Sequence, residues 1–236
     1  MTDKRNIQTI APLLADDFVD LNEPIFDSDK YLDFLDNNAN RLGIFKKYLI
    51  CRLHDSWVID TKQDNGSFKI TLNDFSTYVF ADTLIEKSNL PIESDHISFP
   101  LTIELAENLK VEFNKVDDDG NLIQIDPIKI DEYLYEQVTH LDQEKIEIVF
   151  HFWKSNVKDD KPGERIIVIV SAKDLTITEN QDQAWQDIFG DQFNSLYKYF
   201  KEQFDSDRYV SDHNECEKLI DEFEQNQLTN ERKPTA

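Results

Sequence analysis

Several stretches of the chain alternate apolar and polar residues with a period of two, the pattern of a β-strand with one buried face. The clearest of them cover 97–105, 109–113 and 146–152. The dipeptides Asn65-Gly66 and Asp119-Gly120 separate neighbouring stretches and favour the tight turns of β-hairpins. Because a tight hairpin joins antiparallel strands, this pattern predicts an antiparallel sheet and argues against a parallel nucleotide-binding sheet.

Other stretches repeat their apolar residues with the period of an α-helix. The helix expected over 180–204 has a continuous aromatic stripe that begins at Trp185. The predicted fold class is therefore α+β, with an antiparallel sheet built from consecutive hairpins, helices packed on one face, and long C-terminal helices. The other helices are expected from Ser28, from Asn73 or Asp74 to about Ser88, over 131–140, and from Ser211.

Composition and turn residues divide the chain into four segments. They are an irregular acidic lead (1–27), a helix, hairpin and helix lobe (28–90), an antiparallel sheet with C-terminal helices (91–225), and a mobile polar tail (226–236). The polar stretch 89–95 contains a proline and is the expected joint between the lobes. The sequence leaves open whether 28–90 and 91–225 form one continuous domain.

The charge balance limits the classes of partner. The chain has 48 acidic residues against 25 basic ones, which gives a net charge of −23. Binding to nucleic-acid phosphates or to an anionic membrane requires a surplus of Lys and Arg on some face, and here the basic residues occur only in short groups. We therefore expect no direct nucleic-acid or membrane partner, and an electric field that attracts basic proteins.

The location of the protein is predicted from its apolar runs and its cysteines. The longest uninterrupted apolar run is Ile166–Val170, whereas a helix that spans a membrane needs about 20 residues. Polar residues interrupt the stretch 7–15, which is not typical of a signal peptide. Cys51 and Cys216 both lie in apolar settings, as buried thiols in a reducing compartment do. A cytoplasmic protein is therefore expected.

No motif of a known chemistry is present in full. The sequence lacks glycine-rich phosphate loops, an HExxH zinc motif and a GxSxG nucleophile motif. The acidic turn 117–120 fails as a calcium loop because Lys115 would occupy the first ligand position. His54-Asp55 is a pair also found in metal-dependent phosphohydrolases, but no flanking pattern supports that activity. His213 and Cys216 lie one helical turn apart, and a core cysteine is the better interpretation. We therefore predict no catalytic residues, no cofactor and no metal site.

The remaining feature is the placement of the acids. Eight acids lie between Asp16 and Asp36 against Lys30 alone, and nine lie between Glu202 and Glu224 against two basic residues. Like charges at this density repel one another, so a use in recognition is proposed beside the alternative of a merely solvated surface. The predicted partner-binding residues are Asp16, Asp17, Asp20, Glu23, Asp27, Asp29, Asp33, Asp36, Glu215, Glu217, Asp221 and Glu222.

Two functions from different classes follow from these observations. The leading hypothesis is a non-catalytic intracellular interaction module, such as an inhibitor or immunity-type protein, that binds a basic partner by electrostatic steering. The alternative is a small-molecule-binding or enzymatic α+β domain with a pocket between the sheet and the aromatic helix 185–204. Mimicry of nucleic-acid charge is a third possibility. The sequence leaves the oligomeric state open.

Overall fold

The computed structural model describes residues 5–15, 27–49, 52–64, 66–155, 163–205 and 212–231. The chain forms two compact units, and each is built from two separate stretches of sequence. Met1–Leu72 and Thr102–Thr178 make up the first, which we call the sheet unit, and Asn73–Leu101 and Glu179–Ala236 make up the second, the helical unit. Within the described residues, no helix is both long enough and apolar enough to cross a membrane.

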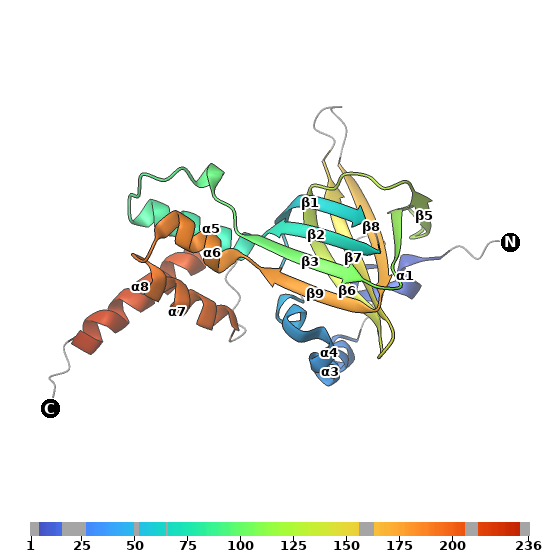
Figure 1. Cartoon of the computed structure of the whole chain (residues 1–236), viewed down its shortest axis with the longest axis horizontal. Helices are drawn as coiled ribbons and strands as arrows, with labels where there is room; N and C mark the ends of the chain where they lie inside the picture. Colours follow the sequence, from blue (N-terminus) through green and yellow to red (C-terminus); the bar gives the residue numbers. More distant parts are fainter. Residues whose placement is uncertain are drawn as a thin grey trace. The chain divides into compact units, whose positions relative to one another are not determined.

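The described residues form a nine-stranded sheet, most of which lies in the sheet unit (Figure 1). The order of the strands is β5-β4-β8-β7-β6-β1-β2-β3-β9. The strands whose residue pairing is defined run antiparallel to each other, and consecutive strands such as β6–β7 and β7–β8 form hairpins. The strands are β1 Ser56–Asp64, β2 Ser67–Asn73, β3 Pro100–Ala106, β4 Lys110–Val116, β5 Leu122–Ile125, β6 Glu132–Leu141, β7 Ile146–Lys154, β8 Glu164–Ala172 and β9 Asp174–Glu179.

Strands β7 and β8 are buried on both faces. On one face Phe150 and Phe152 lie against Tyr133 of β6, with ring centroids 6.1 and 5.5 Å apart. On the other face Val149 and Ile167 join a separate apolar cluster with the first helices of the chain. Near-continuous apolar runs such as Ile166–Val170 are therefore explained by burial on both sides, which requires a cover on each face.

The sheet curls so that strands distant in the strand order come into contact. The ring of Phe68 on β2 meets the ring of Phe113 on β4 edge-on at 6.3 Å, although four strands separate β2 from β4 in the sheet. Figure 1 shows β1, β2 and β3 turned over β6, β7 and β8. The curl therefore gives the apolar residues on the inner face a cover made from the same sheet.

Short helices cover the other face of the central strands. Ile7 and Leu14 of the first two helices are fully or almost fully buried in the cluster with Val149. The backbone N–H of Ile7 donates to Gly120 O at 2.8 Å, and that of Leu13 donates to the side chain of Gln137 at 3.0 Å. The helices of the sheet unit are α1 Ile7–Ile10, α2 Pro12–Ala15, α3 Ser28–Asn37, α4 Ala39–Leu42 and the 3-10 helix η1 Gly43–Tyr48.

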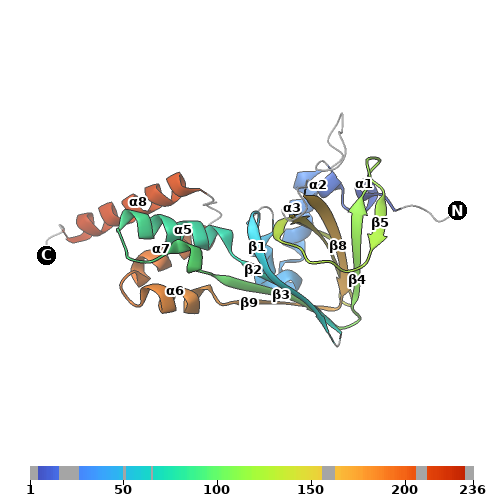
Figure 2. The ribbon, with the colours of Figure 1, turned by 90° about the horizontal axis from the view of Figure 1, so that it is seen from above.

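The helical unit has an aromatic core. Trp185 stacks on Tyr197 at 4.3 Å, and Phe80 stacks on Phe200 at 4.2 Å. Figure 2 shows α8 running beside α5, and Cys216 and Leu219 of α8 are fully buried in this core. The helices are α5 Phe75–Lys87, the 3-10 helix η2 Ser94–His96, α6 Gln181–Phe189, α7 Asn194–Asp205 and α8 His213–Glu231.

The predicted α+β class with an antiparallel sheet is confirmed, and several elements differ from the sequence-based expectation. The stretch 131–140 is strand β6, not a helix. The prediction failed because register shifts between Tyr133 and Tyr135 and between Val138 and His140 break the period of two that identifies strands. The aromatic stripe over 180–204 is divided into α6 and α7 at Gly190, whose φ of 59° does not fit an α-helix. Helix α8 continues to Glu231, within the expected tail.

A buried carboxyl lies at the start of α5. Asp74 is 2% exposed, and its Oδ2 accepts hydrogen bonds from Thr77 Oγ1 at 2.6 Å and from Gln181 Nε2 at 3.5 Å. Its Oδ1 and the Gln181 Oε1 are buried and have no hydrogen-bond partner among the described residues. Burial raises the pKa of Asp74. The native state therefore binds this proton more tightly than the unfolded state does, so the contribution to stability is lost as the pH rises through the raised pKa.

Replacing Asp74 by Asn should stabilise the protein at pH 7 by about 1 kcal/mol, because a neutral amide removes the buried charge and keeps an acceptor for Thr77. The gain should be smaller at pH 5 than at pH 7, because the raised pKa leaves more of the wild-type carboxyl protonated as the pH falls. Urea denaturation at both pH values measures the difference, with Glu86→Gln on α5 as the exposed control. Equal destabilisation by Asp74→Asn at both pH values would contradict this account.

Candidate functional site

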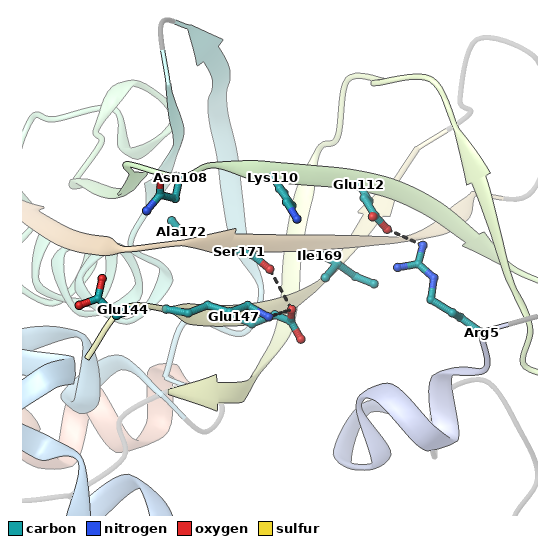
Figure 3. Close-up of a pocket in the computed structure, with 10 residues that line it drawn as sticks. Arg5, Asn108, Lys110, Glu112, Glu144, Glu147, Ile169, Ser171 and Ala172 are labelled. Carbon is teal, nitrogen blue, oxygen red and sulfur yellow. Dashed lines mark hydrogen bonds and ion pairs between the residues drawn. The ribbon is translucent and has the colours of Figure 1, made fainter. Parts of the chain in front are cut away.

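A pocket of about 430 Å³ opens on one face of the sheet unit, where β4, β8 and β7 are neighbours (Figure 3). Lys110 and Glu112 come from β4, Ser171 from β8 and Glu147 from β7. The turn between β3 and β4 adds Asn108, whose positive φ of 52° is tolerated by Asn. The pocket is therefore built mainly from polar side chains on adjacent strands, a rigid support for a site.

Glu147 is the carboxylate with the most hydrogen bonds in this pocket. Its oxygens accept from Lys145 Nζ at 2.7 Å, Ser171 Oγ at 2.8 Å and Thr139 Oγ1 at 3.0 Å. Burial alone raises the pKa of Glu147, but these three hydrogen bonds outweigh burial and hold it below its usual value. A carboxylate with a lowered pKa is a weak base, so the arrangement favours binding over proton abstraction from Ser171.

Some of the other polar side chains of the pocket form ion pairs within the protein, and others do not. Arg5 forms an ion pair with Glu112, drawn as a dashed line in Figure 3. Lys110 and Asn108 have no hydrogen bond or ion pair within the described part of the chain. These two side chains are the ones available to a small polar or anionic ligand.

The described part of the first acidic cluster lies on and beside α3. Asp27 and Asp36 are each ion-paired with a lysine, at 2.6 and 2.5 Å. Asp29 and Asp33 are exposed and form no ion pair with any described residue. The other predicted members of this cluster, Asp16, Asp17, Asp20 and Glu23, lie outside the described residues.

The second acidic cluster lies on α8. Glu215 is paired with a lysine of the same helix at 2.5 Å, and Asp221 is paired with Lys87 of α5 at 2.6 Å. Glu217 and Glu222 are exposed. The described residues of each predicted acidic cluster therefore lie on or beside one helix, and lysines neutralise some of their charges.

The motifs considered in the sequence have structural explanations. Asp117 Oδ1 accepts from the backbone N–H groups of Asp119 and Asn121 at 3.1 and 2.8 Å, so the acidic turn uses this carboxylate internally. Cys216 is fully buried, and burial raises its pKa to about 12. Cys51 lies outside the described residues. No group of three or more His, Cys, Asp or Glu side chains suited to a metal ion occurs among the described residues.

The chain has no counterpart in the comparisons: no protein-family model matches it, and searches of curated proteins and of solved structures found no match.

Sequence reasoning did not identify the pocket residues. Glu147 and Ser171 are 24 positions apart in sequence and meet because β7 and β8 pair with Glu147 opposite Ser171. The alternation over 146–152 puts Glu147 on the opposite face from the apolar residues Ile146 and Ile148, but the register that brings it to Ser171 depends on the hairpin between the strands.

Replacing Glu147 by Gln should destabilise the protein by about 1 kcal/mol at pH 7, because the amide cannot accept from all three donors. Because the pKa of Glu147 is lower in the native state than in the unfolded state, the ionised carboxylate stabilises the fold at any pH above its unfolded-state pKa. That stability is lost as the pH falls through the native pKa. The difference from wild type should therefore shrink below about pH 4. Urea denaturation at both pH values measures it.

Glu144→Gln is the matched control because Glu144 lines the same pocket and is exposed. It should change the free energy of unfolding by less than about 0.5 kcal/mol. If the two variants lose the same stability, the hydrogen bonds to Glu147 do not have the role described.

Proposed function

We propose that the protein is a non-catalytic interaction module that binds a basic protein partner through its acidic surfaces. The observation that supports this most directly is the position of the acids on α3 and α8, both of which place apolar side chains inward and carboxylates outward. On α3, Tyr31 and Leu35 are buried while Asp29 and Asp33 are exposed.

Electrostatic steering is the mechanism of this proposal. A net charge of −23 attracts a basic protein over about one Debye length, roughly 8 to 10 Å at physiological salt. Complementary fields raise the association rate and exclude acidic partners, while a few buried contacts supply most of the affinity. Carboxylates that form no ion pair with a described residue, such as Asp29 and Asp33, gain the most from a partner's cations.

Small-molecule binding is the second candidate, and the pocket beside Glu147 favours it. The rings of Trp185 and Tyr197, which suggested a pocket at the aromatic helix, stack on each other inside the core of the helical unit. The pocket beside Glu147 has Lys110 available for an anionic group, so a screen of small carboxylates by thermal shift tests this candidate separately.

Removing two acids from either cluster should weaken the complex with the basic partner about two- to tenfold at low salt. The variants are Asp29→Asn with Asp33→Asn on α3, and Glu217→Gln with Glu222→Gln on α8. The partner is obtained by affinity capture with the full chain and a salt gradient, and its affinity for each purified variant is then measured at several salt concentrations.

Asp118→Asn with Asp119→Asn is the matched control, because it removes the same charge from an exposed turn outside both clusters. A partner that binds both cluster variants as tightly as this control, or whose affinity does not depend on salt, would refute the proposal.

A further inference from the structure

The pocket beside Glu147 has strand β8 as its floor and a wall on either side. Lys110 on β4 is the cross-strand neighbour of Ser171 on β8, and Ser171 is the cross-strand neighbour of Glu147 on β7. Cross-strand neighbours point to the same face of a sheet. Ile169 lies two residues before Ser171 on β8, so it points to this face as well and gives the floor an apolar part. The strand register therefore fixes which side chains line the pocket.

The charges that line this pocket balance, although the whole chain is strongly acidic. Three basic and three acidic side chains line it, whereas the chain has 48 acidic residues against 25 basic ones. The six are Arg5, Lys110, Lys145, Glu112, Glu144 and Glu147. A site without net charge has no long-range attraction for a simple anion or a simple cation. A ligand that carries one charge of each sign matches it better.

Four of these six side chains are paired with one another. Arg5 forms an ion pair with Glu112, and Lys145 Nζ lies 2.7 Å from Glu147 Oε2. The hydroxyl of Ser171 also donates to Glu147 at 2.8 Å. These four charges are therefore compensated within the protein.

Lys110 and Glu144 are the two charged side chains of the lining that remain. Neither side chain forms a hydrogen bond or an ion pair with any residue that the structure describes. Figure 3 shows Lys110 on one side of β8 and Glu144, from the turn between β6 and β7, on the other. Asn108 lies on the same side as Lys110 and is likewise without a side-chain partner among the described residues. The pocket thus offers a ligand one cation, one anion and one carboxamide.

We infer that the pocket binds a small zwitterion, a free α-amino acid with an aliphatic side chain. Lys110 binds its carboxylate, and Glu144 binds its ammonium group. Both charged groups of an α-amino acid are bonded to one carbon atom, so the carboxamide of Asn108 serves both. Its Nδ2 donates to the carboxylate, and its Oδ1 accepts from the ammonium group. Ile169 offers an apolar contact to the aliphatic side chain.

Ligands with a single charge use only part of this site. A simple carboxylate would pair with Lys110 but add a like charge to the pocket that Glu144 lines, and an amine would do the reverse. The volume of about 430 Å³ lies within the usual range of small-molecule sites, roughly 300 to 1,000 Å³. The inference rests on the second candidate function, small-molecule binding, and names its ligand class. It does not depend on the acidic clusters of α3 and α8.

Titration of the 15N-labelled full chain with three probes of similar size tests the ligand class. L-leucine carries both charges, 4-methylpentanoate lacks the ammonium group, and 3-methylbutylamine lacks the carboxylate. L-leucine at millimolar concentration should shift the backbone N–H signals of Ser171 and Glu144 in a saturable way. The two probes with a single charge should bind at least about fivefold more weakly. The indole signal of Trp185, which lies in the core of the helical unit, should not move.

Variants assign each charge of the ligand to one side chain. Lys110→Met should weaken the binding of L-leucine about fivefold but not that of 3-methylbutylamine, because the amine does not use the lysine. Glu144→Gln should weaken L-leucine binding to a similar extent but not the binding of 4-methylpentanoate. Lys129→Met is the matched control, because Lys129 is an exposed lysine of the sheet unit that does not line this pocket. It should bind L-leucine as the wild type does.

The three probes separate failure of this inference from failure of the second candidate function. Equal affinity for L-leucine and 4-methylpentanoate would refute the amino-acid ligand and leave the pocket a small-molecule site. Wild-type affinity for L-leucine in Lys110→Met or Glu144→Gln would also overturn the inference, and no saturable shift with any probe would refute both. The double variants on α3 and α8 should bind L-leucine as the wild type does, because none of their positions lines the pocket.

Discussion

The burial of β7 and β8 on both faces is the constraint on which the rest of the sheet unit depends. Apolar side chains on two faces need two covers, and the chain provides them by different means. The curl of the sheet, seen in the contact between Phe68 and Phe113, closes over one face, and α1 with α2 closes over the other. Because α1 and α2 are short, they cover only part of that face, and the pocket beside Glu147 opens on the remainder.

Strand β7 shows how one face is divided between packing and binding. Its alternate residues Glu147, Val149, His151 and Trp153 point to the same side. Val149 lies in the apolar cluster with α1 and α2, Glu147 lies in the pocket at one end, and the Trp153 ring lies against the backbone of Gly163 at the other. A single strand face thus carries both a polar residue of the pocket and an apolar residue of the core.

The acidic character of the chain has different physical consequences at different places. Where carboxylates meet donors, as at Glu147, the pKa falls and the charge is stabilised. Where they meet one another or the interior, as at Glu132 and Asp74, the pKa rises and the charge is a cost. The two carboxyls differ in solvent access, because Glu132 is half-buried whereas Asp74 is fully enclosed.

The sequence by itself determined the α+β class, the antiparallel hairpins and the inward aromatic residues of the helical unit, because these follow from local periodicity and turn residues. It failed at 131–140, where bulges in β6 hide the strand pattern. Only the tertiary structure decided which side chains meet across strands. Trp57, Glu132 and Trp153 are far apart in sequence and become neighbours through strand register, which depends on long-range pairing and bulges that no local pattern specifies.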